Sequence, residues 1–155
     1  MRPLIVYSSR TGNTRRVARA MAESLGADCL SVDHVTEQHL AQRRLIGLGS
    51  GIYWARTDDK ILELARKIPS NCQTFLFITS GLRFTTMVNY YKNLLSKTLR
   101  KKDVRQVKVW HCPGFDKYPM FKWMGISKSR PDQRDLAEAR RFALKMGKQS
   151  SPHPA

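Results

Sequence analysis

Three short segments, rich in glycine and in hydroxyl side chains, carry the residue types that can bind a ligand without a covalent bond. They are Ser9-Arg10-Thr11-Gly12-Asn13-Thr14, Gly49-Ser50-Gly51-Ile52-Tyr53-Trp54 and Thr79-Ser80-Gly81-Leu82-Arg83-Phe84. Hydroxyl and amide groups donate hydrogen bonds to anionic oxygens, and glycine lets a ligand approach the backbone closely. These three segments are therefore the candidate ligand-binding turns of the sequence.

The first segment has the composition of a phosphate site. It joins an apolar run to a helical pattern, so the N–H groups and the positive dipole of a helix N-terminus add to its side-chain donors. Its spacing differs from the G-x-x-x-x-G-K-[ST] loop of nucleotide triphosphatases and from the G-x-G-x-x-G loop of dinucleotide binders. A phosphate monoester is the better fit. The alternative is a turn that merely caps the helix.

Apolar runs that indicate strands alternate with segments of helical periodicity. Strands are expected at 4–7, 29–32, 44–49, 74–78 and 104–111, and helices at 12–25, 58–67, 85–99 and 132–146, with a partial helix within 34–42. In the helix at 85–99, Tyr90 falls within the apolar stripe. This order is typical of one α/β domain whose mostly parallel sheet is covered on both faces, here assigned to residues 1–148, with a disordered tail at 149–155. Ligands bind outside the carboxyl ends of such strands, where all three segments fall.

The composition is that of a globular protein, but the charge is unusual. The 155 residues are 41% hydrophobic and 26% charged, and 28 Lys and Arg against 12 Asp and Glu give a formal net charge of +16. Such a chain favours acidic partners, anionic membranes or nucleic acid. Cys29, Cys72 and Cys112 lack metal-ligand spacing, which suits reduced thiols and a cytoplasmic location. The sequence predicts neither a signal peptide nor a membrane span.

Patterns for other chemistry are absent from the sequence. A C-x₅-R phosphatase loop and a G-x-S-x-G hydrolase elbow do not occur, and the four histidines lack partners at metal-ligand spacing. His111, at the end of the last expected strand, could approach a ligand edge, although a structural role is favoured. We therefore expect no protein catalytic residue and no metal.

The three segments resemble the ligand loops of flavodoxins. Residues 9–14 are similar to the [ST]-x-T-G-N-T loop that binds the FMN phosphate in that family. Residues 49–53 resemble the first loop that meets the flavin ring, and residues 79–81 resemble the second. The resemblance implies a flavodoxin-like three-layer sandwich, with a five-stranded parallel sheet of order 2-1-3-4-5 and helices on both faces. It also implies FMN as the cofactor.

The resemblance assigns roles to individual residues. Side chains of Ser9, Thr11, Asn13 and Thr14, with the amide of Gly12, would bind the phosphate. Gly51 would lie beside the flavin edge, Tyr53 or Trp54 would stack on one ring face, and Phe84 would cover the other. Backbone groups of Ser80, Gly81 and Leu82 would face the pyrimidine edge. Arg10, Ser50, Ile52, Thr79 and Arg83 complete the expected cofactor-binding set. Ordinary packing is the alternative for Tyr53 and Trp54.

The functional hypothesis is an FMN-binding electron carrier whose basic surface docks a redox partner protein with an acidic face. Familiar flavodoxins are acidic, so Arg10 and Arg83 predict a less negative potential for the second electron here. One alternative is a flavin-dependent reductase or oxidase that holds a planar anionic substrate, of the quinone or porphyrinogen type, under the segment 113–130. Another is a non-redox module that binds nucleic acid or anionic lipid. Nucleic acid is disfavoured because no nucleic-acid module accompanies the basic clusters, whereas peripheral membrane contact stays open.

Overall fold

The computed structural model describes residues 1–52, 57–80, 85–100, 108–113 and 130–150. Strands and helices alternate along these residues, as the apolar pattern predicts. In chain order the elements are β1 (Leu4–Ser8), α1 (Asn13–Leu25), β2 (Asp28–Ser31), the 3₁₀ turn η1 (Val32–His34), α2 (Glu37–Leu40), β3 (Leu45–Gly51), α3 (Asp59–Lys67), β4 (Gln73–Ser80), α4 (Thr85–Arg100), β5 (Lys108–Pro113) and α5 (Gln133–Ser150).

The sheet has the order β2-β1-β3-β4-β5, and every pair of neighbouring strands is parallel. This confirms the expected architecture and strand order. After β1 the chain passes to β2 on one side and then returns to β3 on the other. The strand order therefore reverses between β1 and β3, and the carboxyl ends of these two strands flank the crevice in which open α/β sheets bind ligands.

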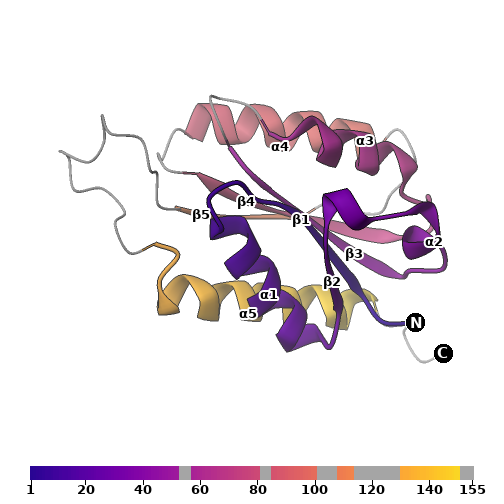
Figure 1. The fold of residues 1–155 in the computed structure, drawn as a ribbon, viewed down its shortest axis with the longest axis horizontal. Coiled ribbons are helices and arrows are strands. Elements are labelled where there is room, and N and C mark those ends of the chain that lie inside the picture. The colour runs from indigo at the N-terminus through magenta and orange to yellow at the C-terminus, as the bar shows by residue number, and fades with distance from the viewer. Residues whose placement is uncertain (53–56, 81–84, 101–107, 114–129, 151–155) are drawn as a thin grey trace.

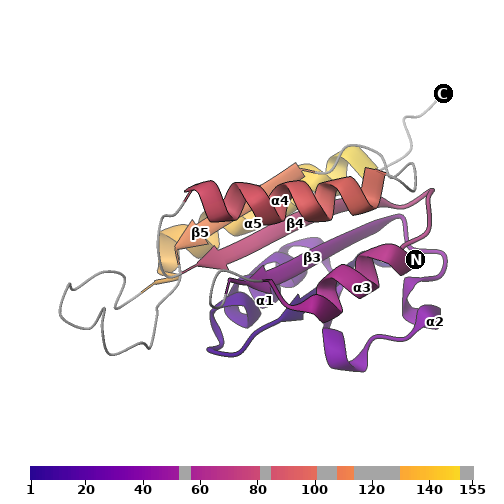
Figure 2. The same ribbon diagram turned by 90° about the horizontal axis from the view of Figure 1, so that it is seen from above.

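Helices cover both faces of the sheet, as Figures 1 and 2 show. α1 and α5 lie on one face, over a core that includes Ile5, Phe75 and Phe77. α3 and α4 lie on the other, over a core that includes Val6 and Leu76. Successive side chains of a strand point to opposite faces, so each strand contributes to both cores. A strand buried on both sides reads as the continuous apolar run seen in the sequence.

Gly49 makes room for a large ring in the core beneath α1 and α5. A Cβ at Gly49 would lie 2.1 Å from Cε2 and Cζ of Phe77, whose side chain is fully buried. No real Cβ tolerates such a distance, so the ring occupies the space that the absent side chain leaves. The glycine in this strand is therefore explained by packing.

Local signals fix the ends of the helices. α1 follows Gly12 and is followed by Gly26, and both glycines have the left-handed backbone conformation that glycine adopts readily. α3 begins after Asp58, whose side chain accepts a hydrogen bond from the Lys60 N–H. Before α5, Asp132 Oδ1 accepts 2.9 Å hydrogen bonds from the Arg134 and Asp135 N–H groups. Each helix thus starts where the sequence places a turn.

Some boundaries differ from those the sequence predicts. β5 runs from Lys108 to Pro113, and residues 104–107 of the expected strand lie outside the described residues. α5 continues to Ser150, so residues 149 and 150 are helical, and 151–155 of the expected tail lie outside the described residues. Tyr90 is 62% exposed, so its place in a buried stripe is wrong. No helix in the described part of the chain is long and apolar enough to span a membrane.

Candidate functional site

The described parts of the three ligand segments meet at the carboxyl edge of the sheet. Ser8 at the end of β1 pairs in register with Ser50 of β3, and Gly51 pairs with Thr79 of β4. The segments that begin after residues 8, 48 and 78 are therefore neighbours in space, although about 70 residues of chain separate the first from the last. The sequence prediction that they form one site is consistent with this placement.

The segment 9–14 presents backbone N–H groups at the start of α1. Gly12 has φ 89°, and its N–H donates a 3.1 Å hydrogen bond to Ser9 Oγ. Because glycine has no side-chain acceptor, no side chain of the N-cap residue caps this helix, and its first turn contains no acidic residue. α3 differs, since its N-terminus is capped by the carboxylate of Asp58. Of these two helix N-termini, α1 is the one suited to an external anion.

Two arginines add positive charge to this segment. Arg10 is exposed within the loop. A guanidinium nitrogen of Arg15, one turn into α1, lies 3.9 Å from the position that a Cβ of Gly12 would take. The sequence analysis overlooked Arg15, because a charged residue on an amphipathic helix is normally part of the solvated face. Its position beside the glycine backbone reinforces the preference for an anion.

A buried hydroxyl pair joins the first segment to the third. Thr14 is fully buried, and its Oγ1 lies 2.8 Å from Oγ1 of Thr79. The backbone carbonyl of Thr79 also accepts a 2.9 Å hydrogen bond from the Ile52 N–H. Thr79 therefore contacts both other segments. These hydrogen bonds fix the relative positions of all three at the end of the sheet.

Asp58 connects the start of α3 to the same edge of the sheet. Its Oδ2 accepts a 2.5 Å hydrogen bond from Ser8 Oγ, and its backbone N–H donates a 3.2 Å hydrogen bond to Ser50 Oγ. The carboxylate thus ties β1 to α3, and the backbone ties α3 to β3. Sequence reasoning places a helix start at Asp58 but overlooks these contacts with Ser8 and Ser50. The N-cap signal identifies the residue, whereas nothing local identifies its long-range partners.

His111 forms a further polar pair at the ends of β4 and β5. Its Nε2 lies 2.8 Å from Oγ of Ser80, the last residue of β4. Cys112 follows on the opposite face and is buried, and desolvation raises the pKa of its thiol to about 12. His111 therefore contacts a predicted site residue, while Cys112 remains a protonated thiol of the core.

The expected cofactor residues fall into two groups. The structure places the following at the carboxyl edge: Ser9, Arg10, Thr11, Gly12, Asn13, Thr14, Ser50, Gly51, Ile52, Thr79 and Ser80. Lying outside the described residues are Tyr53, Trp54, Gly81, Leu82, Arg83 and Phe84, and with them the predicted ring-stacking contacts. The segment 114–129, expected to matter for a substrate, also lies outside. The described residues include the whole segment predicted to hold the phosphate and the first residues of both segments predicted to meet the ring.

The donor set of the described residues fits a phosphate monoester. Hydroxyl side chains, a helix N-terminus without a side-chain cap, the guanidinium group of Arg15 and the exposed Arg10 of the loop all favour an anion with several oxygen acceptors. The carboxylate of Asp58 is engaged with Ser8 and with the start of its own helix. The site therefore has an anion-binding segment at the start of α1, and beside it the hydrogen bonds that hold the neighbouring loops in place.

Comparisons with known proteins agree with this fold. A family model described as a flavodoxin domain matches residues 4–115. The uncharacterized protein MJ0298 of Methanocaldococcus jannaschii is 33% identical over 146 residues, which cover 92% of this chain and 96% of that protein. Flavodoxin 1 from Bacillus cereus superposes with a TM-score of 0.73 at 14% identity, covering 97% of this chain and 100% of that one. A flavodoxin from the domain Archaea gives a TM-score of 0.71 at 16% identity, covering 97% and 99%.

Proposed function

The chain belongs to the flavodoxin family, and on that premise we propose that it binds FMN non-covalently and serves as an electron carrier. The observation that carries the proposal is the α1 N-terminus without a side-chain cap. It follows a left-handed Gly12 and opens at the point where the strand order reverses. Anions bind at helix N-termini, and open α/β sheets bind ligands where the strand order reverses. Both rules point to the N-terminus of α1.

In this proposal the segment 9–14 holds the FMN phosphate. The N–H groups of the first turn of α1 and the hydroxyls of Ser9 and Thr11 donate hydrogen bonds to the phosphate oxygens. The Gly12 N–H, which now contacts Ser9 Oγ, is one of these donors. Arg10 and Arg15 offset part of the negative charge of the phosphate dianion, so phosphate binding does not depend on the backbone N–H donors alone.

The remaining contacts set the positions of the loops around the ring. When bound, FMN accepts and releases electrons one or two at a time, and the protein sets the potential at which it does so. The Ile52 N–H bonded to Thr79 and the Asp58 N–H bonded to Ser50 hold both ends of the loop that contains Tyr53 and Trp54. A loop held at both ends loses less conformational entropy when a ring packs against it.

The basic charge suggests how the potential differs from that of acidic flavodoxins. The formal net charge is +16, and Arg10 stands in the segment proposed to hold the phosphate. Positive charge favours the reduced anionic form of a flavin over the neutral form. We therefore expect a less negative potential for uptake of the second electron than acidic flavodoxins have.

A visible absorption spectrum recorded during stepwise reduction tests the proposed function. The purified protein is incubated with FMN, separated from free cofactor and titrated with dithionite under anaerobic conditions. The proposal predicts retained flavin, and reduction in two stages separated in potential. Colourless protein that takes up no FMN would contradict it and would favour a binding module without redox activity.

The same preparation distinguishes a carrier from a direct-acting enzyme. A carrier should reduce quinones and oxidise porphyrinogens slowly in the absence of another protein. Rapid turnover of either substrate by the purified protein alone would replace the carrier with a flavin-dependent reductase or oxidase. Because the three cysteines are free, we keep the cytoplasm, a reducing compartment, as the proposed location.

A further inference from the structure

The two helices that cover one face of the sheet present a strongly cationic outer surface. α1 and α5 pack side by side beneath the sheet in Figure 1, and the same two helices share one core. We call their outward surface the α1/α5 face. Its charged residues are the cations Arg15, Arg16, Arg19, Arg134, Arg140, Arg141, Lys145 and Lys148 and the acids Glu23 and Glu138.

Helical spacing explains why the cations share this surface. In α5 the buried positions Leu136, Ala139, Ala143 and Met146 recur every three or four residues and point to the sheet. The cations of α5 take the positions that face away from the sheet. The two charged stripes are adjacent, because a guanidinium nitrogen of Arg140 lies 3.8 Å from a carboxylate oxygen of Glu23 across the helix pair.

The helix α3, on the other side of the sheet, has nearly balanced charge. Its exposed charged residues are Asp59, Lys60, Glu63, Arg66 and Lys67. Lys60 pairs with Asp33 at 2.5 Å, and Lys67 pairs with Glu37 at 3.4 Å. Acids and local pairs thus neutralise much of this surface. The α1/α5 face differs from α3, because its eight cations stand against only two acids.

The side-chain chemistry of the α1/α5 face favours carboxylates. Six of its eight cations are arginines, whose planar groups bind carboxylates through two parallel hydrogen bonds. The aromatic residue of these helices, Phe142, is half-buried and packs edge-on against Phe75 at 5.6 Å, so it does not offer a stacking surface to bases. Leu144, which is 43% exposed, is the large apolar side chain that α1 and α5 present to solvent. One such side chain provides little apolar surface for insertion into a bilayer.

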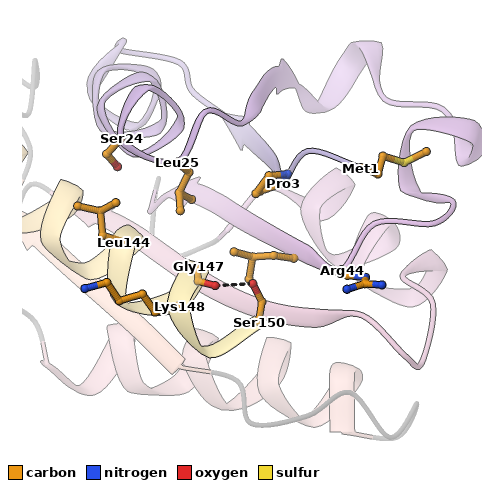
Figure 3. A pocket seen from close by; sticks show the side chains of 10 residues that line it. Met1, Pro3, Ser24, Leu25, Arg44, Leu144, Gly147, Lys148 and Ser150 are labelled. Atoms are coloured by element: carbon orange, nitrogen blue, oxygen red, sulfur yellow. Dashed lines mark hydrogen bonds between the residues drawn. The ribbon is translucent and has the colours of Figure 1, made fainter. Parts of the chain in front are cut away.

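A cavity at the far end of this face gives a protein partner an anchoring point. It has a volume of about 410 Å³ and lies between the C-terminal ends of α1 and α5 and the amino ends of the strands (Figure 3). Leu25 and Leu144 contribute apolar surface, while Arg44 and Lys148 contribute charge. An apolar side chain flanked by carboxylates fits such a lining, and buried anchors of this kind carry much of the affinity of protein interfaces.

The face also reaches the cofactor end of the molecule. Both α1 and α5 follow parallel strands, so their N-termini lie at the carboxyl edge beside the segment 9–14. The 18 residues of α5 span roughly 27 Å at the usual rise per residue. A standard interface buries about 800 Å² on each partner, which is a patch of similar breadth. One partner can therefore cover the cavity and still approach the carboxyl edge.

We propose that the α1/α5 face is the docking surface for an acidic redox protein. That the partner is a redox protein rests on the proposed function, whereas its acidic character rests on the charges of the face. Opposite charges accelerate encounter and orient the two proteins before close contact forms.

The test measures binding, and therefore does not depend on bound flavin. The probe is a plant-type [2Fe–2S] ferredoxin, a small acidic electron carrier, and its Kd is measured by isothermal titration at about 50 and 150 mM salt. The variant carries Arg141→Glu and Lys145→Glu. The control carries Arg66→Glu and Lys67→Glu on α3, which makes the same change in net charge. Circular dichroism verifies that both variants fold.

The proposal predicts at least tenfold weaker binding for the α5 variant and less than threefold weaker binding for the α3 control. Replacing the same two α5 residues with Gln should give an intermediate Kd. Equal losses in the two Glu variants would overturn the assignment to this face. Tighter binding of a 20-base-pair DNA duplex, or of phosphatidylglycerol vesicles, than of ferredoxin at 150 mM salt would overturn the acidic protein as occupant. Adding FMN to a parallel sample reports separately on the proposed cofactor.

Discussion

Replacing Asp58 with alanine should destabilise the fold and weaken FMN binding together. The carboxylate accepts hydrogen bonds from the Ser8 hydroxyl at 2.5 Å and from the Lys60 N–H at 2.9 Å. The first contact fixes the end of β1, and the second caps α3. The substitution removes both and leaves the Ser8 hydroxyl, which is 5% exposed as a residue, without its acceptor.

The expected magnitude follows from these two contacts. Loss of an N-cap side chain costs about 0.5–2 kcal/mol, and loss of a hydrogen bond to a charged group costs about 1.5–3 kcal/mol. Because Asp58 is only half-buried and its contact with the Lys60 N–H is exposed, we take the lower half of the combined range. The free energy of unfolding should then fall by roughly 2–3 kcal/mol, which lowers Tm by several degrees for a domain of this size.

Urea denaturation and FMN titration of the same variants provide the assay. Asp59→Ala is the matched control, because Asp59 is the next residue and an exposed acid. A double-mutant cycle with Ser8→Ala isolates the contact between the two side chains. FMN affinity should fall in Asp58→Ala because the end of β1, from which the segment 9–14 continues, loses its hydrogen bond to the start of α3. The reasoning is refuted if Asp58→Ala costs no more stability than Asp59→Ala, or if the cycle shows no coupling.

Three further predictions concern the core and the cysteines. Gly49→Ala should lower the free energy of unfolding by about 1–3 kcal/mol or more, because the added methyl group would overlap the buried ring of Phe77. Urea denaturation measures this change. A near-neutral result would show that the ring moves freely. Among the thiols, Cys29 should react first with Ellman's reagent at pH 8, because it lines an open hollow, whereas burial raises the pKa values of Cys72 and Cys112 to about 12. The thiols of the unfolded chain ionise near pH 9.0, whereas the two buried thiols of the folded protein stay protonated, so a pH above 9.0 favours unfolding. The free energy of unfolding should therefore fall between pH 8 and 10.5. A flat profile would contradict the burial of both thiols.

The strand pattern and the site's position were predictable from the sequence because both are encoded locally. Each buried parallel strand is a short apolar run, and each ligand segment follows directly after such a run. The left-handed turn at Gly12 is equally local, since a glycine between hydroxyl residues before a helical pattern indicates it. Tyr90 shows the limit of periodicity, because an aromatic ring on a helical stripe can still face solvent.

The contacts that hold the site together could not be predicted in this way. Ser8 and Asp58 are 50 residues apart, and Thr14 and Thr79 are 65 apart. A hydroxyl at a strand end has several potential partners, and the choice depends on the side of the sheet to which each helix returns. The same holds for Arg15, whose approach to Gly12 depends on a rotamer and not on spacing. Topology had to be known before these partners could be named.

The relative affinity for FMN and riboflavin tests the central claim most directly, because the two flavins differ only in the phosphate. Fluorescence titration of the apoprotein with each flavin gives both Kd values under identical conditions. Loss of two charge-assisted hydrogen bonds, at about 1.5–3 kcal/mol each, predicts riboflavin binding at least about 100-fold weaker than FMN binding. Equal affinities, or no binding of FMN, would contradict the assignment of residues 9–14 as the phosphate site.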